Sequence, residues 1–420
     1  MTGLIGYDAP YWDQWWKIPL IVKSIEGTIG LSDYWSLINE HRVFFPNLIT
    51  IPLAGMTNWT IGLELILTLI FAIGAFLLLS SCIIKKDPRS DSRGLWPIVP
   101  VISLLMFSYS QDNIWMWGLH LMIPMTLLAM LITIHCLIRD EIAAKNLITA
   151  ILFAIIASYS FGAGIVIWGV GGVLLVVRVI RKIANAKAFL AAWCLACVFT
   201  MSLYFVGYES TPSDSAELSA IQHPLSFLQY VIAYLGAPLA PYGNTAPVLM
   251  GVFGFGLMVY FGRRTWRSTS WSDAWGDGRV RLAVSLILLA VGCATLTALK
   301  QWPEGPQQAA SSRYLAWSTM FWVAILLLSR TPACPNTLRR NLFVFIVAFG
   351  LIASVHGAYR AEERHDAFEL GREALITNTN DAHLLYLYPT PDVPTEMRAD
   401  LINYKLSVFR FDSNRDQSHE

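Results

Sequence analysis

Charged residues are scarce in this chain of 420 residues, because Lys, Arg, Asp and Glu together make up only 14% of it. Soluble domains carry about 25% of these residues, so a soluble enzyme could not cover its surface with this composition. Hydrophobic residues make up 55% of the chain. Apolar runs such as Ile61–Leu79 and Leu282–Leu296 approach the roughly 20 residues that cross a bilayer as a helix. The scarcity of charge therefore excludes a set of soluble domains and indicates a polytopic membrane protein.

Three other absences narrow the possible functions. The net charge is only +1 and no run of basic residues occurs, so no nucleic-acid partner is predicted. The six cysteines lie in apolar runs or in loops assigned below to the cytoplasm, which excludes a disulfide framework. Cys194 and Cys197 are spaced like a redox pair, but their apolar helix favours buried packing. Residues 1–16 lack a basic region followed by an apolar stretch, so no signal peptide is expected.

Ten apolar stretches predict an all-α fold with about ten transmembrane helices. The region 222–240 is also apolar, but it is interrupted and bounded by prolines, so we interpret it as an interfacial or re-entrant helix rather than a span. The ten predicted spans lie near 60–83, 96–110, 114–137, 146–160, 163–179, 188–207, 246–262, 281–299, 314–330 and 341–358.

The basic residues of the short loops predict the orientation in the membrane. If the ten spans alternate in direction, 18 Lys and Arg residues lie in loops on one side, and only five lie on the other side outside the C-terminal tail. Short loops rich in Lys and Arg stay in the cytoplasm, so both termini are predicted to lie outside a bacterial inner membrane. The five outer cations are Lys17, Lys23, Arg42, Lys300 and Arg313.

Composition divides the chain into three regions. Residues 1–58 form an aromatic-rich, amphipathic segment outside the membrane, 59–358 form the transmembrane domain, and 359–420 form a small external domain. The last region begins with a charged, helical stretch and continues with two short predicted strands, Leu384–Tyr388 and Leu406–Phe411. It is therefore expected to be a small α/β tail that docks on the membrane part, because about 60 residues cannot build a large core of their own.

Two carboxylates near the start of the chain are candidates for chemistry. Asp8 and Asp13 lie close to Trp12, Trp15 and Trp16, and a carboxylate surrounded by aromatic rings is partly desolvated, which raises its basicity. The rings also offer stacking faces to a sugar or a lipid headgroup. The alternative interpretation is an interfacial aromatic belt with a solvated carboxylate.

The sequence Asn39-Glu40-His41-Arg42 is a candidate anion site. It places a guanidinium beside an imidazole at the membrane surface, and an Arg side chain can bind two phosphate oxygens in a planar fork. A surface ion pair between Glu40 and Arg42, which would contribute little to stability, is the alternative.

Further candidates lie at the outer ends of the spans. Lys300 and Arg313-Tyr314 bracket an outer loop, where they either bind an anionic headgroup or merely snorkel to the membrane surface. Glu64 lies about one and a half turns below the outer end of the first span. An acid inside a span is functional by default, although a shallow one can also reach water.

Other polar or glycine-rich patterns favour structure over chemistry. Gly162-Ala-Gly164 and Gly169-Val-Gly171-Gly172 lie in apolar spans and predict close helix packing rather than a phosphate-binding loop. Glu363, His365 and Asp366 are predicted to lie on a solvated helix face rather than to bind a metal ion.

Short motifs along nearly the whole chain resemble those of a large set of bacterial integral-membrane proteins. At superfamily level that set is similar to the C-type (GT-C) glycosyltransferases, and its first external loop reads Asp-Gln-Trp, then Asn-Glu-His-Arg and Phe-Pro. The matching positions are Asp13–Trp15, Asn39–Arg42, Phe45–Pro46, Asn113–Gly118, Ser160–Gly162, Ile167–Trp168, Arg313–Tyr314, Leu387–Pro389 and Leu406–Phe409.

The resemblance implies a multi-span enzyme that uses a polyprenyl-phosphate sugar as its donor. An acid in the first external loop deprotonates the acceptor hydroxyl, which attacks the anomeric carbon with inversion while the lipid phosphate leaves. By position, Asp13 is the implied base, with Asp8 or Glu40 as substitutes. The implied phosphate- and substrate-binding residues are His41, Arg42, Lys300, Arg313, Tyr314, Trp15 and Glu64.

The chain departs from the superfamily pattern in two ways. Members have a transmembrane helix before this loop, whereas this chain opens inside the loop, so either its first span inserts with the N-terminus outside or a helix lies upstream. No tight Asp-Asp or Asp-Glu pair stands near Asp13, so dependence on a divalent metal stays open, and no other cofactor is predicted. The acceptor stays open between a glycan, a lipid and a protein of the cell envelope.

Two alternatives to an enzyme follow from the same residues. A transporter or flippase of lipid-linked sugars would need ionisable groups near the bilayer midplane and two related halves, whereas Glu64 is the only acid in a predicted span and no internal repeat is visible. A noncatalytic membrane scaffold would tolerate replacement of Asp13, Arg42 and Arg313.

Overall fold

The structure is a computed structural model that describes most of the chain. Four of the predicted cytoplasmic cations, Lys85, Lys86, Arg89 and Arg93, lie outside the described residues. The described ranges are 7–84, 98–208, 222–268, 270–331, 334–379 and 381–411.

Helices lie at each of the ten predicted spans, and most agree with the predicted ends to within a few residues. Among the described residues, seven helices are long and apolar enough to cross a membrane, which confirms an all-α polytopic membrane protein; the count of ten spans stays a prediction. The ten helices are α5 (Ile61–Ile84), α6 (Ile98–Met106), α8 (Met122–Leu137), α9 (Ala144–Ser158), α10 (Val166–Ile180), α11 (Ala186–Tyr204), α14 (Thr245–Ser268), α16 (Gly278–Gln301), α18 (Leu315–Ser329) and α19 (Asn336–Thr377).

Shorter elements connect these helices and cover one end of the bundle. The described sheet consists of two-residue antiparallel strands with Leu37 opposite Arg42. The shorter elements are η1 (Trp12–Lys17), α2 (Ile18–Ile25), α3 (Leu31–Tyr34), β1 (Leu37–Ile38), β2 (His41–Arg42), α4 (Phe44–Thr57), η3 (Tyr109–Gln111), α7 (Asp112–Met116), η4 (Gly118–Leu121), η5 (Gly162–Ile165), α13 (Pro224–Gly236), η7 (Ala237–Leu239), α15 (Trp271–Gly276), η8 (Trp302–Glu304), α17 (Gly305–Ala309), η9 (Ser312–Tyr314), α20 (Asp381–Leu384), α21 (Asp392–Asn403) and η10 (Ser407–Phe409).

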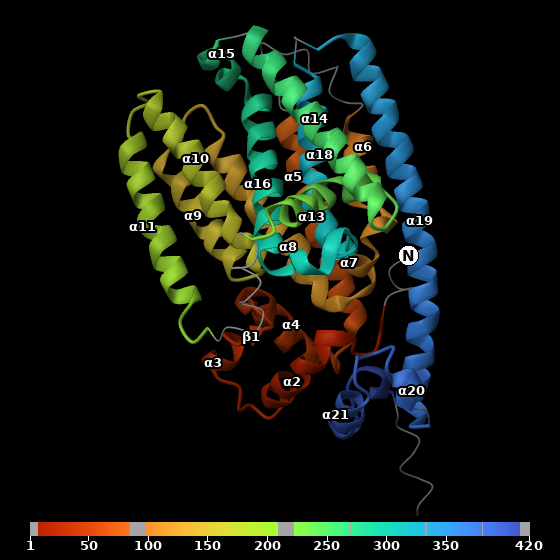
Figure 1. Ribbon diagram of the computed structural model, residues 1–420. Coiled ribbons are helices and arrows are strands. Elements are labelled where there is room, and N and C mark those ends of the chain that lie inside the picture. Colours follow the sequence, from red (N-terminus) through yellow and green to blue (C-terminus); the bar gives the residue numbers. More distant parts are fainter. Residues whose placement is uncertain are drawn as a thin grey trace, which may run out of the picture.

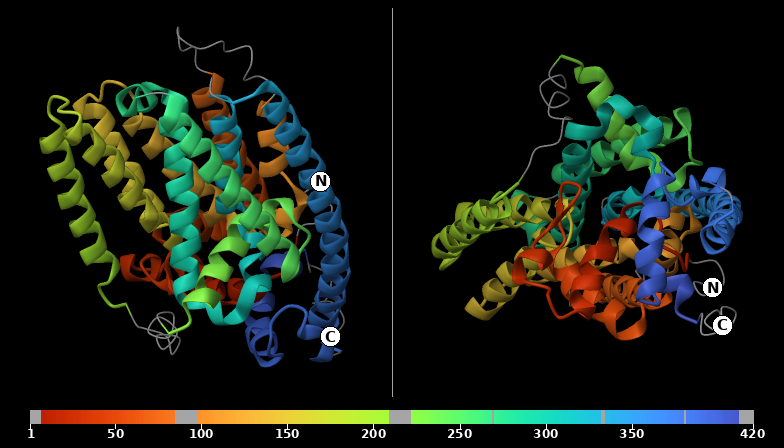
Figure 2. Two further views of the ribbon diagram at one scale, coloured as in Figure 1. Left: turned by 45° about the horizontal axis from the view of Figure 1, so that its top comes forward. Right: turned by 90° about the horizontal axis from the view of Figure 1, so that it is seen from below.

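The long helices run side by side, and the N-terminal segment and the C-terminal tail meet at the same end of the bundle (Figure 1). We call this end, which carries η1, β1, β2 and α21, the site end; α15 lies at the opposite end. The view from below in Figure 2 shows the red N-terminal segment beside the blue tail across the site end. Helix α13 lies across the bundle near that end and packs against α14 and α16 (Figure 1).

Central helices are buried on all sides, whereas peripheral helices expose apolar side chains, as expected for a protein surrounded by lipid. All 15 residues of α18 are buried, because this helix packs against α8, α13, α14 and α16 at once and is apolar all round. Helix α11 buries one seam that includes Trp193 and exposes apolar residues such as Leu195, which is 73% exposed. Exposed apolar side chains on a long helix are stable against lipid but not against water. Cys194 is exposed on the same helix, so the prediction that it is buried was wrong.

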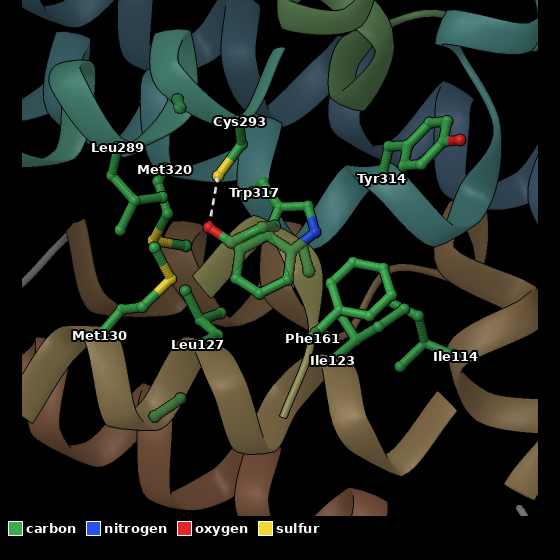
Figure 3. Close-up of a cluster of buried hydrophobic side chains, with 14 of the residues drawn as sticks. Ile114, Ile123, Leu127, Met130, Phe161, Leu289, Cys293, Tyr314, Trp317 and Met320 are labelled. Carbon is green, nitrogen blue, oxygen red and sulfur yellow. Dashed lines mark hydrogen bonds between the residues drawn. The ribbon is translucent and has the colours of Figure 1, made fainter. Parts of the chain in front are cut away.

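The core lies around α18. Figure 3 shows Met320 and Trp317 of α18 packed among Leu127 and Met130 of α8 and Cys293 of α16. The Cys293 thiol donates a long hydrogen bond to the backbone oxygen of Ala163, with an S···O distance of 3.9 Å. Ala163 lies in η5, directly before α10, so this hydrogen bond connects the start of α10 to the centre of the bundle.

The tail is helical, so the predicted α/β tail is wrong. Leu384–Tyr388 closes in local turns, in which the Tyr386 and Leu387 amides donate to the backbone oxygens of His383 and Leu384 at 3.0 and 2.9 Å. In the second predicted strand, η10 forms instead. Each of these amides donates to an oxygen three residues earlier in the chain, so these groups need no partner strand.

Helix α19 crosses the predicted boundary at residue 358 without a break. Its 42 residues correspond to a length of about 63 Å at 1.5 Å per residue, about twice the hydrocarbon thickness of a bilayer. One helix therefore belongs both to the bundle and to the tail, and it brings charged residues of the tail to the side of the N-terminal segment (Figure 1).

Candidate functional site

Glu64 anchors the N-terminal segment to the bundle. Its side chain is only 2% exposed, and its two oxygens accept hydrogen bonds from Gln14 Nε2 at 3.2 Å and Trp59 Nε1 at 3.1 Å. A Cβ atom on Gly118 would lie 2.4 Å from the same carboxylate, so only glycine allows this close approach. Both oxygens therefore accept hydrogen bonds from protein donors, and the bond from Gln14 connects η1 to α5.

Asp13 lies in η1, next to the anchoring Gln14. Asn39 Nδ2 donates a hydrogen bond to its Oδ2 at 3.0 Å. Burial raises the pKa of Asp13, and the Asn39 hydrogen bond and the Arg313 charge oppose that rise in part. A carboxylate with a raised pKa is a stronger base than a free one, so Asp13 has the electrostatic environment that proton abstraction needs.

Exposed indole rings flank Asp13. Trp12 and Trp16, one residue before and three after it, are 42% and 49% exposed. Trp12 has a φ of 48°, a conformation that is uncommon for a bulky residue, and its amide donates to the Leu387 backbone oxygen of the tail at 2.8 Å. The tail therefore helps to present these rings. Trp15, in contrast, is fully buried beneath them.

His41 lies in β2, with its ring centroid 4.3 Å from that of Phe161. Burial lowers the pKa of His41 to about 4, with smaller contributions from neighbouring charges that include Arg313 and Lys300, so the imidazole is neutral near pH 7. Its Nδ1 atom is buried and has no hydrogen-bond partner among the described residues. His41 therefore offers a neutral polar nitrogen rather than a positive charge.

Glu40 and Lys300 form an ion pair between the β hairpin and the end of α16. Their nearest oxygen and nitrogen atoms are 3.1 Å apart, and both side chains are mostly shielded from solvent. Lys300 Nζ also donates to the Tyr208 hydroxyl at 3.4 Å. The charge of Lys300 is thus largely balanced within the protein.

The guanidinium of Arg42 is hydrogen-bonded to backbone oxygens of the protein. Its guanidinium donates to the backbone oxygens of Trp35 at 2.8 Å, of Tyr204 at 3.0 Å and of Val206, and the residue is almost fully buried. Two of these oxygens lie at the C-terminal end of α11, where backbone carbonyls lack helical partners. Arg42 therefore caps α11 and ties it to the N-terminal segment.

Arg313 differs from the other predicted outer cations. Lys17 donates to Thr50 Oγ1 at 3.0 Å and Lys23 forms an ion pair with Asp33 at 2.7 Å, so four of the five predicted cations are bound to protein groups. Arg313 forms no hydrogen bond or ion pair with any residue that the structure describes, and its Nε atom is buried. Its guanidinium lies 5.0 Å from the ring centroid of Tyr314.

These residues form one group, which we call the Asp13 cluster. The Arg313 charge lowers the pKa of both Asp13 and His41, so the three side chains are within electrostatic range of one another. The ring of Tyr314, which the Arg313 guanidinium contacts, stacks on Tyr234 with a centroid distance of 5.4 Å. The Asp13 cluster consists of Asp13, Asn39, Glu40, His41, Lys300 and Arg313.

Asp8 contacts the tail instead. Its carboxylate forms an ion pair with Arg372 of α19 at 2.9 Å, and Ser407 Oγ donates to its backbone oxygen at 2.7 Å. No described contact joins Asp8 to the Asp13 cluster. Glu369 also pairs with Arg372 at 3.5 Å, so Asp8 belongs to a partly exposed network that attaches the tail.

Sequence reasoning missed a second buried acid. The side chain of Asp112, at the start of α7, is fully buried and forms an ion pair with Arg364 of α19, which also donates to Asn113 Oδ1 at 2.8 Å. Asp112 directly precedes an apolar run, and Arg364 lies in a stretch interpreted as solvated. No local pattern links two residues 252 positions apart, so only the folded chain reveals this pair.

In comparisons with models of protein families, with curated proteins and with solved structures, nothing matched the chain. The described ranges contain no group of three or more His, Cys, Asp or Glu residues that could hold a metal ion. Any functional assignment therefore rests on the Asp13 cluster and on its position at the end of a membrane bundle.

Proposed function

We propose that this protein is a membrane glycosyltransferase that transfers a sugar from a polyprenyl-phosphate donor to a hydroxyl group of a cell-envelope acceptor. The observation that carries the proposal is that the charge of Arg313 lies within electrostatic range of the Asp13 carboxylate. Asp13 is a desolvated carboxylate held by a single hydrogen bond from Asn39, and Arg313 is a guanidinium without a described polar partner. Transfer from a phosphate leaving group requires a base for the acceptor and a cation for the departing phosphate, and these two residues supply both groups.

The reaction can be assigned to residues of the cluster. Asp13 takes the proton of the acceptor hydroxyl, and the acceptor oxygen forms a bond to the anomeric carbon from the face opposite the phosphate. The bond between the anomeric carbon and the phosphate oxygen breaks, and its electron pair leaves with the lipid phosphate. Arg313 balances the negative charge of that phosphate. The exposed rings of Trp12 and Trp16 offer stacking faces for the acceptor.

The proposal includes an orientation. The site end would face outward from a bacterial inner membrane, because the basic short loops that the structure describes lie at the opposite end. The ten predicted spans would cross the membrane with both described ends of the chain outside. A donor whose lipid lies in the outer leaflet could then reach Arg313 from the bilayer, whereas the acceptor would reach Asp13 from the aqueous side.

The direct test is transfer by the purified protein in proteoliposomes. Wild-type protein is supplied with short-chain polyprenyl-phosphate sugars and with envelope acceptors, and free polyprenyl phosphate and glycosylated acceptor are measured together. We expect the two products to form in equal amounts. Movement of a lipid-linked sugar across the bilayer without release of polyprenyl phosphate would contradict the proposal and would favour a flippase.

The pH dependence of the rate is a specific prediction for Asp13. The carboxylate acts as a base only when it is deprotonated, so kcat/KM should fall as the pH drops through the raised pKa of Asp13. The Asn39 hydrogen bond lowers that pKa, so Asn39→Ala should move the acidic limb of the profile to higher pH. His41 has a pKa of about 4, so His41→Asn should leave the limb in place. A limb that does not move in Asn39→Ala would rule out Asp13 as its source.

Gly162 gives a steric test of His41. A Cβ atom at Gly162 would lie 2.7 Å from His41 Nδ1, whereas one at Gly169 would meet nothing within 4 Å. Gly162→Ala should therefore displace the imidazole and lower the transfer rate by about ten- to a hundredfold, because small misplacements in a site are costly. Gly169→Ala, the matched control, should leave the rate unchanged. Equal rates in the two variants would show that the position of His41 does not matter.

A further inference from the structure

Trp317 has a polar atom that the protein leaves unused. The residue lies in α18 and is completely buried, and its indole Nε1 has no hydrogen-bond partner among the described residues. Figure 3 shows the indole nitrogen on the side of the ring that faces Phe161 and Tyr314, whereas Cys293 and Met320 lie on the other side. The N–H group therefore lies on the side of the ring where Phe161, which contacts His41, and Tyr314, which contacts Arg313, are found.

Most other buried indoles of this chain are paired. Buried polar groups nearly always have a hydrogen-bond partner, and Trp322, on the same helix, donates to the Leu235 backbone oxygen at 2.8 Å. The paired indoles are those of Trp59, Trp115, Trp168, Trp193 and Trp322. Trp15 and Trp117 share the lack of a described partner with Trp317, but only Trp317 lies one helical turn from Arg313.

Three unused polar atoms lie near one another. Arg313 lies in η9, directly before α18, and Trp317 lies in the first turn of α18. Trp317 and His41 contact the same ring, because Phe161 lies 6.1 Å from Trp317 and 4.3 Å from His41 between centroids. Arg313 Nε, Trp317 Nε1 and His41 Nδ1 are all buried without a described partner. Leaving several such atoms unpaired costs free energy unless a ligand with several oxygen atoms binds among them.

We propose that the Trp317 indole N–H donates a hydrogen bond to a phosphate oxygen of the ligand that Arg313 binds. The assignment rests on the proposed function, in which that phosphate belongs to the lipid donor. An indole N–H donates and cannot accept, and it carries no charge. Arg313 therefore supplies the attraction for the anion, and Trp317 fixes the direction in which one oxygen points. Trp317 is thus a positioning residue for the leaving group.

The test compares Trp317→Phe with Trp322→Phe. Both substitutions keep an aromatic ring in α18 and remove one indole N–H, but the N–H of Trp317 is unpaired and that of Trp322 is bonded. Both substitutions leave a similar cavity, but removal of an unpaired donor leaves no acceptor unsatisfied, so Trp317→Phe should lose less thermal stability than Trp322→Phe. Trp322→Phe should unfold at a lower temperature, because it leaves the Leu235 oxygen without its donor.

The effects on ligand binding should be reversed, with Trp317→Phe affected more than Trp322→Phe. The affinity for a ten-carbon prenyl phosphate, measured by calorimetry in detergent, should fall about tenfold or more in Trp317→Phe, because hydrogen bonds to charged groups are strong. In Trp322→Phe it should stay within twofold of wild type. Inorganic phosphate is the second probe. A loss of affinity for both probes supports a site for the phosphate group itself, and a loss for prenyl phosphate alone supports a site that needs the lipid.

Three results would overturn the assignment. The first is unchanged affinity for both probes in Trp317→Phe, and the second is no binding of either probe to the wild type. The third is a loss of thermal stability in Trp317→Phe as large as that in Trp322→Phe, which would mean that the N–H is already satisfied without a ligand. Weaker prenyl-phosphate binding in Trp317→Phe, combined with no sugar transfer by the wild type, would retain the phosphate site and reject the glycosyltransferase.

Discussion

Replacement of Asp13 by Asn should reduce the rate of sugar transfer by about a hundredfold to ten-thousandfold, the usual contribution of a positioned general base. The substitution keeps the size of the side chain and an oxygen that Asn39 can still donate to. Donor binding should therefore stay close to that of wild type, and the loss should appear in kcat. The measurement is the initial rate of release of polyprenyl phosphate in the presence of a saturating acceptor.

Two matched controls test whether Asp13, rather than Asp8 or Glu40, is the base. Asp8→Asn breaks an ion pair with Arg372 in the tail network, and Glu40→Gln breaks the pair with Lys300. Asp8 and Glu40 were predicted as substitute bases, but each faces a cation that balances its charge. We expect both variants to keep most of the activity. Wild-type turnover in Asp13→Asn, or inactivity of Asp8→Asn with an intact fold, would refute the assignment of the base.

Replacement of Arg364 by Met should cause the largest loss of stability. Asp112 is fully buried and Arg364 is its partner, so the substitution leaves a buried carboxylate without an ion pair, at a cost of about 3–5 kcal/mol. Arg360 lies close by, but it stacks on Tyr242 at 3.9 Å and forms no described ion pair with Asp112. The free energy of unfolding, measured with a chemical denaturant in detergent, should fall accordingly.

The double variant Asp112→Asn with Arg364→Met should recover much of this loss, because a neutral amide is less costly to bury than a charge. Arg372→Met is the control on the same helix. Its partner Asp8 is 37% exposed, and exposed ion pairs contribute about 0–1 kcal/mol. If Arg364→Met and Arg372→Met destabilise equally, the buried pair is not what attaches α19 to the bundle.

The helices were predictable because lipid imposes a simple rule on sequence. A backbone that crosses a bilayer must satisfy its hydrogen bonds internally, so an apolar run of sufficient length predicts a helix whatever its neighbours are. The ends of α5 and α16 agree with the predicted spans to within about three residues. No such rule applied to Leu384–Tyr388. Its apolar side chains fit a strand or a turn equally well, and in the structure its backbone groups form local hydrogen bonds, as in a turn.

The candidate site was predictable as a set of residue types but not as a set of contacts. Arg42 was expected to bind phosphate, but the carbonyl groups at the end of α11, more than 160 residues further along the chain, accept its hydrogen bonds. Nothing in the sequence distinguished Arg313 from the other four predicted outer cations. In the structure it is the one of the five that forms no hydrogen bond or ion pair with a described residue. Trp317 was not predicted at all, because a tryptophan in an apolar span is indistinguishable from core until the partner of its N–H is known.

The sequence alone therefore determined the class of the protein, the places of its long helices and the small number of charges outside the tail, since these follow from local composition and from the cost of burying charge in lipid. Tertiary structure decided which of those charges are neutralised. Pairing depends on distances between groups that are far apart in the chain, and such distances arise only when the helices pack. The same packing joined Asp112 to Arg364, attached Asp8 to the tail, and placed Arg313 within electrostatic range of Asp13.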